Sequence, residues 1–310
     1  MRALKSSRKR ELELDQLRTE QVNHAAHDLD CKSSLEIVRI INAEDKKVAS
    51  AVERALPQIA RAVDLAVGAL RRGGRLIYVG AGTSGRIAAL DASECKPTFN
   101  TDRVQFIIAG GAKALGEESE ISEDDTKLGR DEIARRKVSK NDVVIGVASS
   151  GRTPFTVAAL NAARQRGAQT IALTCNLDSP LERATGFAII TLVGPEVLAG
   201  SSRMKAATAH KMVLNIISTA TMCRLGYVYG NLMVNVVPKN EKLRQRAVSI
   251  LEQAAGVDAK TATAALKAAG DRTPVALVML AAGVSRGKAI EALKKSGGHV
   301  RQAIVGAAKT

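Results

Sequence analysis

Five short runs of apolar, largely β-branched residues occupy the middle of this 310-residue chain, and stretches with helical spacing separate most of them. Within these runs apolar residues follow one another without polar alternation, which is typical of strands covered on both faces. Strands that alternate with helices predict a parallel, doubly wound α/β sheet of five strands. The expected strands are residues 76–79, 104–108, 143–147, 170–173 and 188–193.

A glycine-rich turn follows the first expected strand. The spacing Gly80-x-Gly82-x-x-Gly85 imitates a dinucleotide fingerprint, but Thr83 and Ser84 fill the turn and no acidic residue follows at the distance that a ribose contact needs. Backbone N–H groups and hydroxyls in such a turn bind anions. The turn therefore predicts a site for a phosphorylated small molecule rather than for NAD. A tight strand-to-helix connection without a ligand is the plain alternative.

A second turn of the same kind, with Ser149, Ser150 and Thr153, follows the third expected strand and precedes Pro154, which suits the first turn of a helix. A helix cap needs only one hydroxyl, so three of them favour a phosphate site. Ligands of doubly wound sheets bind outside the carboxyl ends of the strands, where both turns are expected. Farther along, residues 200–205 open a long helix with cations in its first turn. Either an anion compensates these cations or they are exposed.

Carboxylates stand near the expected site in the sequence. Glu94 follows the first turn by one short expected helix, and residues 117–125 hold six carboxylates in nine positions after the second expected strand. Most of such a run is a solvated face. One of its carboxylates can turn into the pocket beside Glu94, where neighbouring carboxylates raise one another's pKa as a general acid requires. A divalent metal is the weaker alternative.

Charge and cysteine content exclude several classes of protein. The net charge is +15, but five basic residues lie in the first ten positions and aromatic residues make up only 2% of the chain, so base stacking on nucleic acid is not expected. An anionic substrate explains the charge more simply. No apolar run approaches the length of a bilayer span, and four scattered cysteines predict neither disulfides nor a zinc site. We therefore expect a cytoplasmic protein without a metal, another cofactor, a membrane anchor or a nucleic-acid partner.

The chain divides into three expected parts. Residues 1–33 lack a sustained apolar face and are interpreted as a flexible lead-in. Residues 34–227 hold two helices and then the sheet, and residues 228–310 form a connection followed by a small helical bundle in which no catalytic motif is visible. A homodimer is expected because the long helix after Ser202 is apolar on more than one face.

Together these motifs resemble one family, the N-acetylmuramic acid 6-phosphate etherases, which have a sugar-isomerase-type (SIS) sugar-phosphate fold. The matching segments follow the family's order over nearly the whole chain. The chain departs from the family at Ala207 and His210, where the family has Gly and Gln, in a segment that the resemblance places near a subunit interface and the sugar. The matching segments are residues 34–45 (SLEIVRIINAED), 80–86 (GAGTSGR), 91–95 (DASEC), 109–111 (AGG), 149–154 (SSGRTP), 200–205 (GSSRMK) and 230–233 (GNLM).

The resemblance implies an enzyme of peptidoglycan recycling that removes D-lactate from N-acetylmuramic acid 6-phosphate and leaves N-acetylglucosamine 6-phosphate. In the open-chain aldehyde the C2 proton is acidic and the lactyl oxygen at C3 is a β leaving group, so elimination needs a base and an acid before water adds. Glu94 matches the family's acid/base residue, and Glu123 matches its second active-site carboxylate. A homodimer with a shared active site is implied as well. The expected ligands of the phosphate and the sugar are Thr83, Ser84, Ser149, Ser150, Thr153, Ser202 and Lys205.

Two other functions remain open at this point. A sugar-phosphate-sensing regulator similar to the glucokinase regulatory protein would bind without turnover, and retention of both Glu94 and Glu123 favours the enzyme over it. A sugar-phosphate-responsive transcription factor needs an N-terminal helix-turn-helix, and the first thirty residues are too polar to supply one.

Overall fold

The chain folds around one sheet of five parallel strands in the order β2-β1-β3-β4-β5. The computed structural model describes residues 17–117 and 120–308. The predicted five-stranded, doubly wound sheet is confirmed, and only the last strand is shorter than expected. The strands are β1 (Leu76–Gly80), β2 (Val104–Ile108), β3 (Val143–Val147), β4 (Gln169–Thr174) and β5 (Ala188–Ile190).

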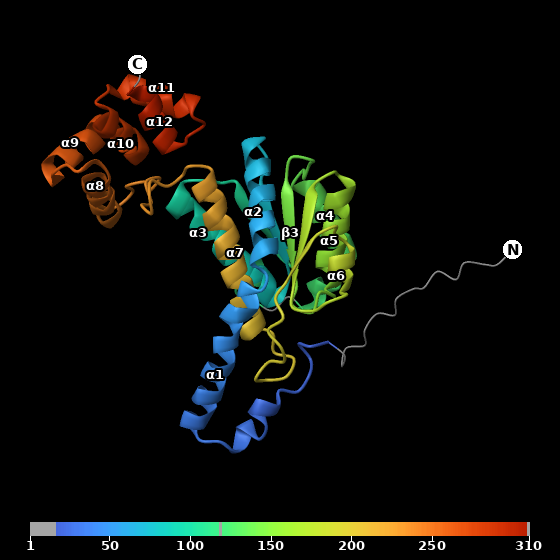
Figure 1. The fold of residues 1–310 in the computed structure, drawn as a ribbon. Helices are drawn as coiled ribbons and strands as arrows, with labels where there is room; N and C mark the ends of the chain where they lie inside the picture. Colours follow the sequence, from blue (N-terminus) through green and yellow to red (C-terminus); the bar gives the residue numbers. More distant parts are fainter. Residues whose placement is uncertain (1–16, 118–119, 309–310) are drawn as a thin grey trace.

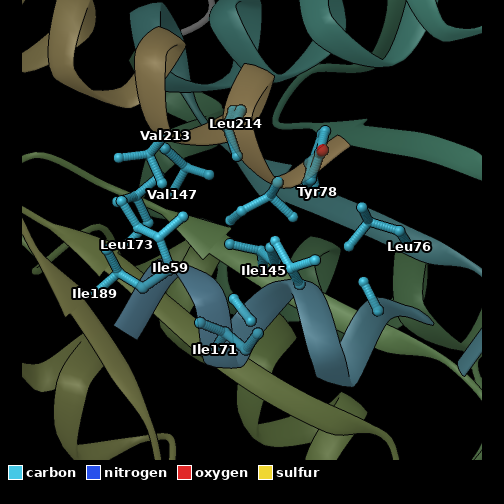
Figure 2. Packing of buried hydrophobic residues seen from close by; sticks show 14 of the residues in the cluster. Ile59, Leu76, Tyr78, Ile145, Val147, Ile171, Leu173, Ile189, Val213 and Leu214 are labelled. Carbon is cyan, nitrogen blue, oxygen red and sulfur yellow. The ribbon is translucent and has the colours of Figure 1, made fainter. Parts of the chain in front are cut away.

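Helices cover both faces of the sheet, as the continuous apolar strands require (Figure 1). On one face lie α1 (Ser34–Glu53), α2 (Leu56–Arg71), α3 (Gly82–Phe99) and α7 (Lys205–Arg224). On the other face lie α4 (Thr126–Arg135), α5 (Pro154–Gln165) and the single turn α6 (Pro180–Arg183). Figure 2 shows the first of the two cores, where residues such as Tyr78, Ile145 and Leu173 of the sheet meet Ile59 of α2 and Leu214 of α7.

The order of the strands reverses at β1. The chain passes from β1 outward to β2 and then returns to the opposite side of β1 to form β3. In open α/β sheets the crevice outside the carboxyl ends of such neighbouring strands is where ligands bind. The turn after β1 and the turn after β3 therefore lie beside each other at this switch point.

Residues 17–33 are attached to the sheet domain. Asn176, just after β4, accepts a hydrogen bond from the N–H of Arg18 and donates one to Thr19 Oγ1, and Asn23 donates one to the carbonyl of Pro195. These contacts tie the second half of the predicted lead-in to the loops after β4 and β5. The first half of the predicted lead-in, residues 1–16, lies outside the described residues.

The C-terminal helices form a second core of their own. They are α8 (Glu241–Ala255), α9 (Ala259–Ala268), α10 (Thr273–Ala282), α11 (Arg286–Lys295) and α12 (Val300–Ala307). Val234 and Val236 of the preceding connection are buried in this core, and Thr273 Oγ1 donates a hydrogen bond to the carbonyl of Val236. The bundle lies at one end of the molecule, and α1 projects from the opposite end (Figure 1).

Candidate functional site

The turn between β1 and α3 presents an open helix N-terminus. Glycine is needed here because a Cβ at Gly85 would lie 2.6 Å from Ile108 Cγ1, and one at Gly80 would lie 2.9 Å from the backbone nitrogen of Gly85. Because Gly80 and Gly85 have no Cβ atoms, α3 can start directly after β1. The residue before this helix, Ala81, has no polar side chain to cap it. The first N–H groups of α3, with Thr83 and Ser84 in the first turn, therefore form a positive helix end of the kind that binds anions.

The turn between β3 and α5 is fixed by hydrogen bonds from residues 174–176, at the end of β4. The carbonyl of Ser149 accepts hydrogen bonds from Cys175 N, Thr174 Oγ1 and Asn176 Nδ2. Ser150 Oγ accepts one from the N–H of Arg152 at 3.2 Å. These bonds fix the backbone of the turn, so its hydroxyl groups are held at the carboxyl end of β3.

The two turns line one cavity of about 420 Å³. This volume is in the range of small-molecule sites. The cavity brings together Glu123 and six of the seven residues expected to bind phosphate or sugar, and residues from the N-terminal segment and the loop before α7 complete it. The full lining is Thr19, Glu20, Ala81, Gly82, Thr83, Ser84, Arg86, Glu123, Ser149, Ser150, Thr153, Gly200 and Ser202.

Glu123 is the carboxylate that the acidic run contributes to the cavity. It ends a short 3-10 helix, Glu120–Glu123, and Asp125 then caps α4 through the N–H of Leu128. A Cβ at Gly82 would lie 2.5 Å from Glu123 Oε1. The Glu123 carboxylate therefore lies directly against the turn between β1 and α3.

Three polar side chains of the lining, those of Arg86, Thr19 and Glu20, were not expected from the sequence. Arg86 donates from Nε to the carbonyl of Ala114 at 2.9 Å and from Nη2 to the carbonyl of Glu117 at 2.8 Å. It lies three residues after Thr83, on the same face of α3, and this spacing is a signal that could have found it. Thr19 and Glu20 come from far away in the chain, and no local pattern marks them.

Lys205 does not line the cavity, contrary to expectation. Its side chain is 1% exposed, and its Nζ lies 2.6 Å from Glu44 Oε2 of α1. The start of α7 binds a second carboxylate, because Glu196 accepts hydrogen bonds from the N–H groups of Lys205 and Ala206. The protein's own carboxylates, rather than a ligand, thus compensate the cation and the positive end of this helix.

The pKa of each of these carboxyls reflects burial and its partners. Burial alone would raise the pKa of Glu44, but hydrogen bonds from Lys205, Lys47 and Asn23 more than offset it and lower the pKa from 4.5 to about 2. For Glu196 burial prevails over the two backbone hydrogen bonds and raises the pKa. The ion pair between Glu44 and Lys205 joins α1 to the start of α7. The loop just before α7 contains Ser202, so this ion pair supports one wall of the cavity.

Glu94 lies outside the cavity. The helix after the first turn, α3, has 18 residues and is not short. Glu94 is ten positions after Ser84, which is about 15 Å along a helix, and its side chain is exposed. Within one chain the two expected catalytic carboxylates are therefore not brought together.

His210 is buried beneath the site and does not contact it. Its Nε2 lies 3.6 Å from Cys175 Sγ, and its Nδ1 has no hydrogen-bond partner among the described residues. Burial lowers the pKa of His210 from 6.5 to about 4 and raises the pKa of Cys175 to about 12. Both groups are neutral at pH 7. Because His210 is fully buried and does not line the cavity, the difference from the family at this position lies in the core.

The described part of the chain lacks two kinds of feature. No group of three or more His, Cys, Asp or Glu side chains in these residues is arranged to hold a metal ion. None of the described helices has the length and apolarity needed to cross a bilayer.

Models of two SIS domains match the part of the chain that forms the sheet and most of the cavity. A family model of the glucokinase regulatory protein N-terminal SIS domain matches residues 58–164, and the SIS domain model matches residues 131–220. Among solved structures, phosphoheptose isomerase GmhA from Neisseria gonorrhoeae is 16% identical with a TM-score of 0.48, over 62% of this chain and all of the other. This structural similarity is too low to support any conclusion about function.

Full-length relatives are much more similar. A protein of Symbiobacterium thermophilum named N-acetylmuramic acid 6-phosphate etherase is 54% identical over 271 residues, which are 87% of this chain and 90% of that protein. The protein of the same name in Edwardsiella ictaluri is 48% identical over 295 residues, 94% of this chain and 98% of its own length. N-acetylmuramic acid 6-phosphate etherase 1 of Bacillus licheniformis is 48% identical over 269 residues, 86% and 88% of the two chains.

Proposed function

The chain belongs to the N-acetylmuramic acid 6-phosphate etherase family, and we propose that it cleaves the D-lactyl ether of N-acetylmuramic acid 6-phosphate in the cavity between β1 and β3. The observation that carries the proposal is the meeting of two hydroxyl-rich turns and the Glu123 carboxylate in one small-molecule cavity. Release of N-acetylglucosamine 6-phosphate and D-lactate would make this a step of peptidoglycan recycling in the cytoplasm. The four free cysteines fit a reducing compartment.

The phosphate of the substrate binds between the two turns. The open N-terminus of α3 supplies backbone N–H groups, and Thr83, Ser84, Ser149, Ser150 and Thr153 supply hydroxyls. Arg86 adds a positive charge on the same side. Ser202 reaches the cavity from the loop before α7 and completes the enclosure of the sugar.

The sugar carbons that react lie beyond the phosphate. Removal of the C2 proton from the open-chain aldehyde and protonation of the lactyl oxygen break the C3 ether, and water then adds at C3. Two carboxylates suffice for these proton transfers when their surroundings separate the acid from the base. Glu123 lies at the cavity, and Glu94 is the second carboxylate.

Glu94 reaches the sugar of a neighbouring chain. Because it is exposed and about 15 Å along α3 from the phosphate turn, it cannot serve its own cavity. Leu90, one helical turn before it, is 46% exposed, and α1 carries Leu35 and Val38, which are 55% and 56% exposed. Apolar side chains left open on two helices support a homodimer in which α3 of one chain lies at the cavity of the other.

Incubation with N-acetylmuramic acid 6-phosphate in heavy-oxygen water tests the activity. We expect equal amounts of D-lactate and N-acetylglucosamine 6-phosphate, with the heavy atom in the sugar at C3 and none in lactate, because elimination breaks the bond between C3 and the ether oxygen. Heavy oxygen at the ether carbon of lactate would contradict elimination. Tight binding without any lactate would favour the second candidate, a regulator, which the match to the glucokinase regulatory protein domain keeps in view.

A further inference from the structure

A second hollow opens from the proposed active-site cavity. It is a groove of about 910 Å³ along α4 and α5, and it shares Glu123, Ser150 and Thr153 with the cavity. The three shared residues form the boundary between the two spaces. A ligand bound at the phosphate turns can therefore extend past Glu123 into the groove.

The lining of the groove includes two cationic side chains, Arg152 and Arg130, and two carboxylates, Glu123 and Asp124. Arg152 is part of the turn after β3, where its N–H binds Ser150 Oγ, so its backbone position is fixed by the site itself. Arg130 is on α4, directly after Gly129. A Cβ at Gly129 would lie 2.4 Å from the carbonyl oxygen of Phe155, so glycine is what lets α4 approach α5 and brings Arg130 to the groove.

The substrate of the proposed reaction has two anionic groups. The phosphate is on C6, and the carboxylate belongs to the lactyl group on C3, on the other side of the sugar. Once the phosphate is fixed between the two turns, the C3 substituent must leave the cavity past the carboxylate that acts on it. A carboxylate that is removed from water needs a cation and hydrogen-bond donors, and a guanidinium group supplies both in a two-pronged geometry.

We propose that Arg152, assisted by Arg130, binds the carboxylate of the lactyl group in this groove and so selects the lactyl ether as the leaving group. The inference rests on the proposed function, because it takes the lactyl sugar phosphate as the ligand. The groove also gives lactate a way out that does not pass the phosphate. The unsaturated sugar stays anchored while water enters at C3.

The test compares two ethers in the wild type and in Arg152→Gln. One is N-acetylmuramic acid 6-phosphate, and the other is N-acetylglucosamine 6-phosphate with a 3-O-isopropyl group, in which a methyl replaces the carboxylate. Loss of a hydrogen-bonded charge pair lowers kcat/KM by about 10- to 100-fold for the lactyl ether. The isopropyl ether should change by less than about twofold, since it has no charge for Arg152 to bind. Arg130→Gln should give a smaller loss with the same selectivity.

Arg164→Gln is the matched control, because Arg164 is an exposed arginine of α5 that does not line the groove. An equal loss for both ethers in Arg152→Gln, or an equal loss in Arg164→Gln, would overturn the proposal. Calorimetry separates it from the activity itself. If the wild type releases no lactate, the proposed function fails, but the subsite still predicts that Arg152→Gln weakens binding of N-acetylmuramic acid 6-phosphate and leaves binding of N-acetylglucosamine 6-phosphate unchanged. Unchanged binding of both would reject the subsite independently.

Discussion

Gly82 decides where the Glu123 carboxylate can lie. Its φ is +48°, a conformation that other residues rarely adopt, and a Cβ here would meet Glu123 Oε1 at 2.5 Å. The clash is with the end of a flexible side chain and not with backbone, so the carboxylate can move away. A substitution should therefore displace the proposed catalytic group more than it destabilises the fold.

We predict that Gly82→Ala lowers kcat for lactate release by about 10²-fold, because a shift of about 1 Å in a reacting group has an effect of this size. The free energy of unfolding should fall by only about 1–2 kcal/mol, the cost of the left-handed conformation for alanine. Gly186→Ala is the control, since nothing lies within 4 Å of its Cβ position. Full activity of Gly82→Ala would show that Glu123 need not lie against the turn.

The element that supports the cavity wall is the first turn of α7. Glu44 of α1 binds the Lys205 side chain, and Glu196 accepts a hydrogen bond from the Lys205 N–H. His210, in the second turn of α7, is fully buried. These groups titrate in different pH ranges, because the pKa of Glu44 is lowered to about 2 and that of His210 to about 4. Acid unfolding can therefore separate their contributions.

Glu44 should stabilise the fold most above pH 4.5. Its pKa is lowered on folding, so the stability that it contributes is complete above the unfolded value of 4.5 and is lost as the pH falls toward about 2. Glu44→Gln leaves Lys205 buried without its partner, and we expect a loss of about 3–5 kcal/mol at pH 7. In urea unfolding the variant should also lose less stability than the wild type between pH 4.5 and 3. Parallel curves for the two proteins would contradict the assignment.

His210 should act at higher pH. Folding lowers its pKa from 6.5 to about 4, so the neutral ring is favoured and stability is lost as the pH falls from 6.5 to about 4. His210→Gln removes the ionisable ring, and its unfolding free energy should decrease less than that of the wild type over this range. Lactate release at pH 7 should be little changed, because the ring lies outside the cavity. A large loss of kcat would show that the ring supports the site directly.

Sequence patterns predict the elements well where burial alone determines them. The five strands are continuous apolar runs because both faces are covered, and residues such as Ile145 and Leu173 are fully buried. The length of α3 was not predictable in this way, because it is packed against both the sheet and α7 and its apolar residues follow no clean stripe. The hydroxyl turns predicted most of the cavity. The burial of Lys205 depends on Glu44, 161 residues away, and no local pattern reveals such a pair.

In a single chain the two proposed catalytic glutamates lie apart. One chain holds the cavity and Glu123, while Glu94 points to solvent about 15 Å away along α3. The helix α1 projects from the body (Figure 1). Its side chains Leu35 and Val38 are exposed. We propose that a second copy covers these helices and brings its own Glu94 to the cavity, so that each active site is made from two chains.

Mixed dimers show whether each active site is made from two chains. Glu94→Gln and Glu123→Gln should each lower lactate release by about 10²–10⁴-fold, the usual effect of losing one acid or base, and each should still bind N-acetylglucosamine 6-phosphate. After the two variants are unfolded together and refolded, half of the dimers are mixed, and each mixed dimer regains one complete site. We expect recovery of about a quarter of the wild-type rate of lactate release. A mixture that stays as inactive as either variant, although mixed dimers have formed, would show that both glutamates serve the same chain.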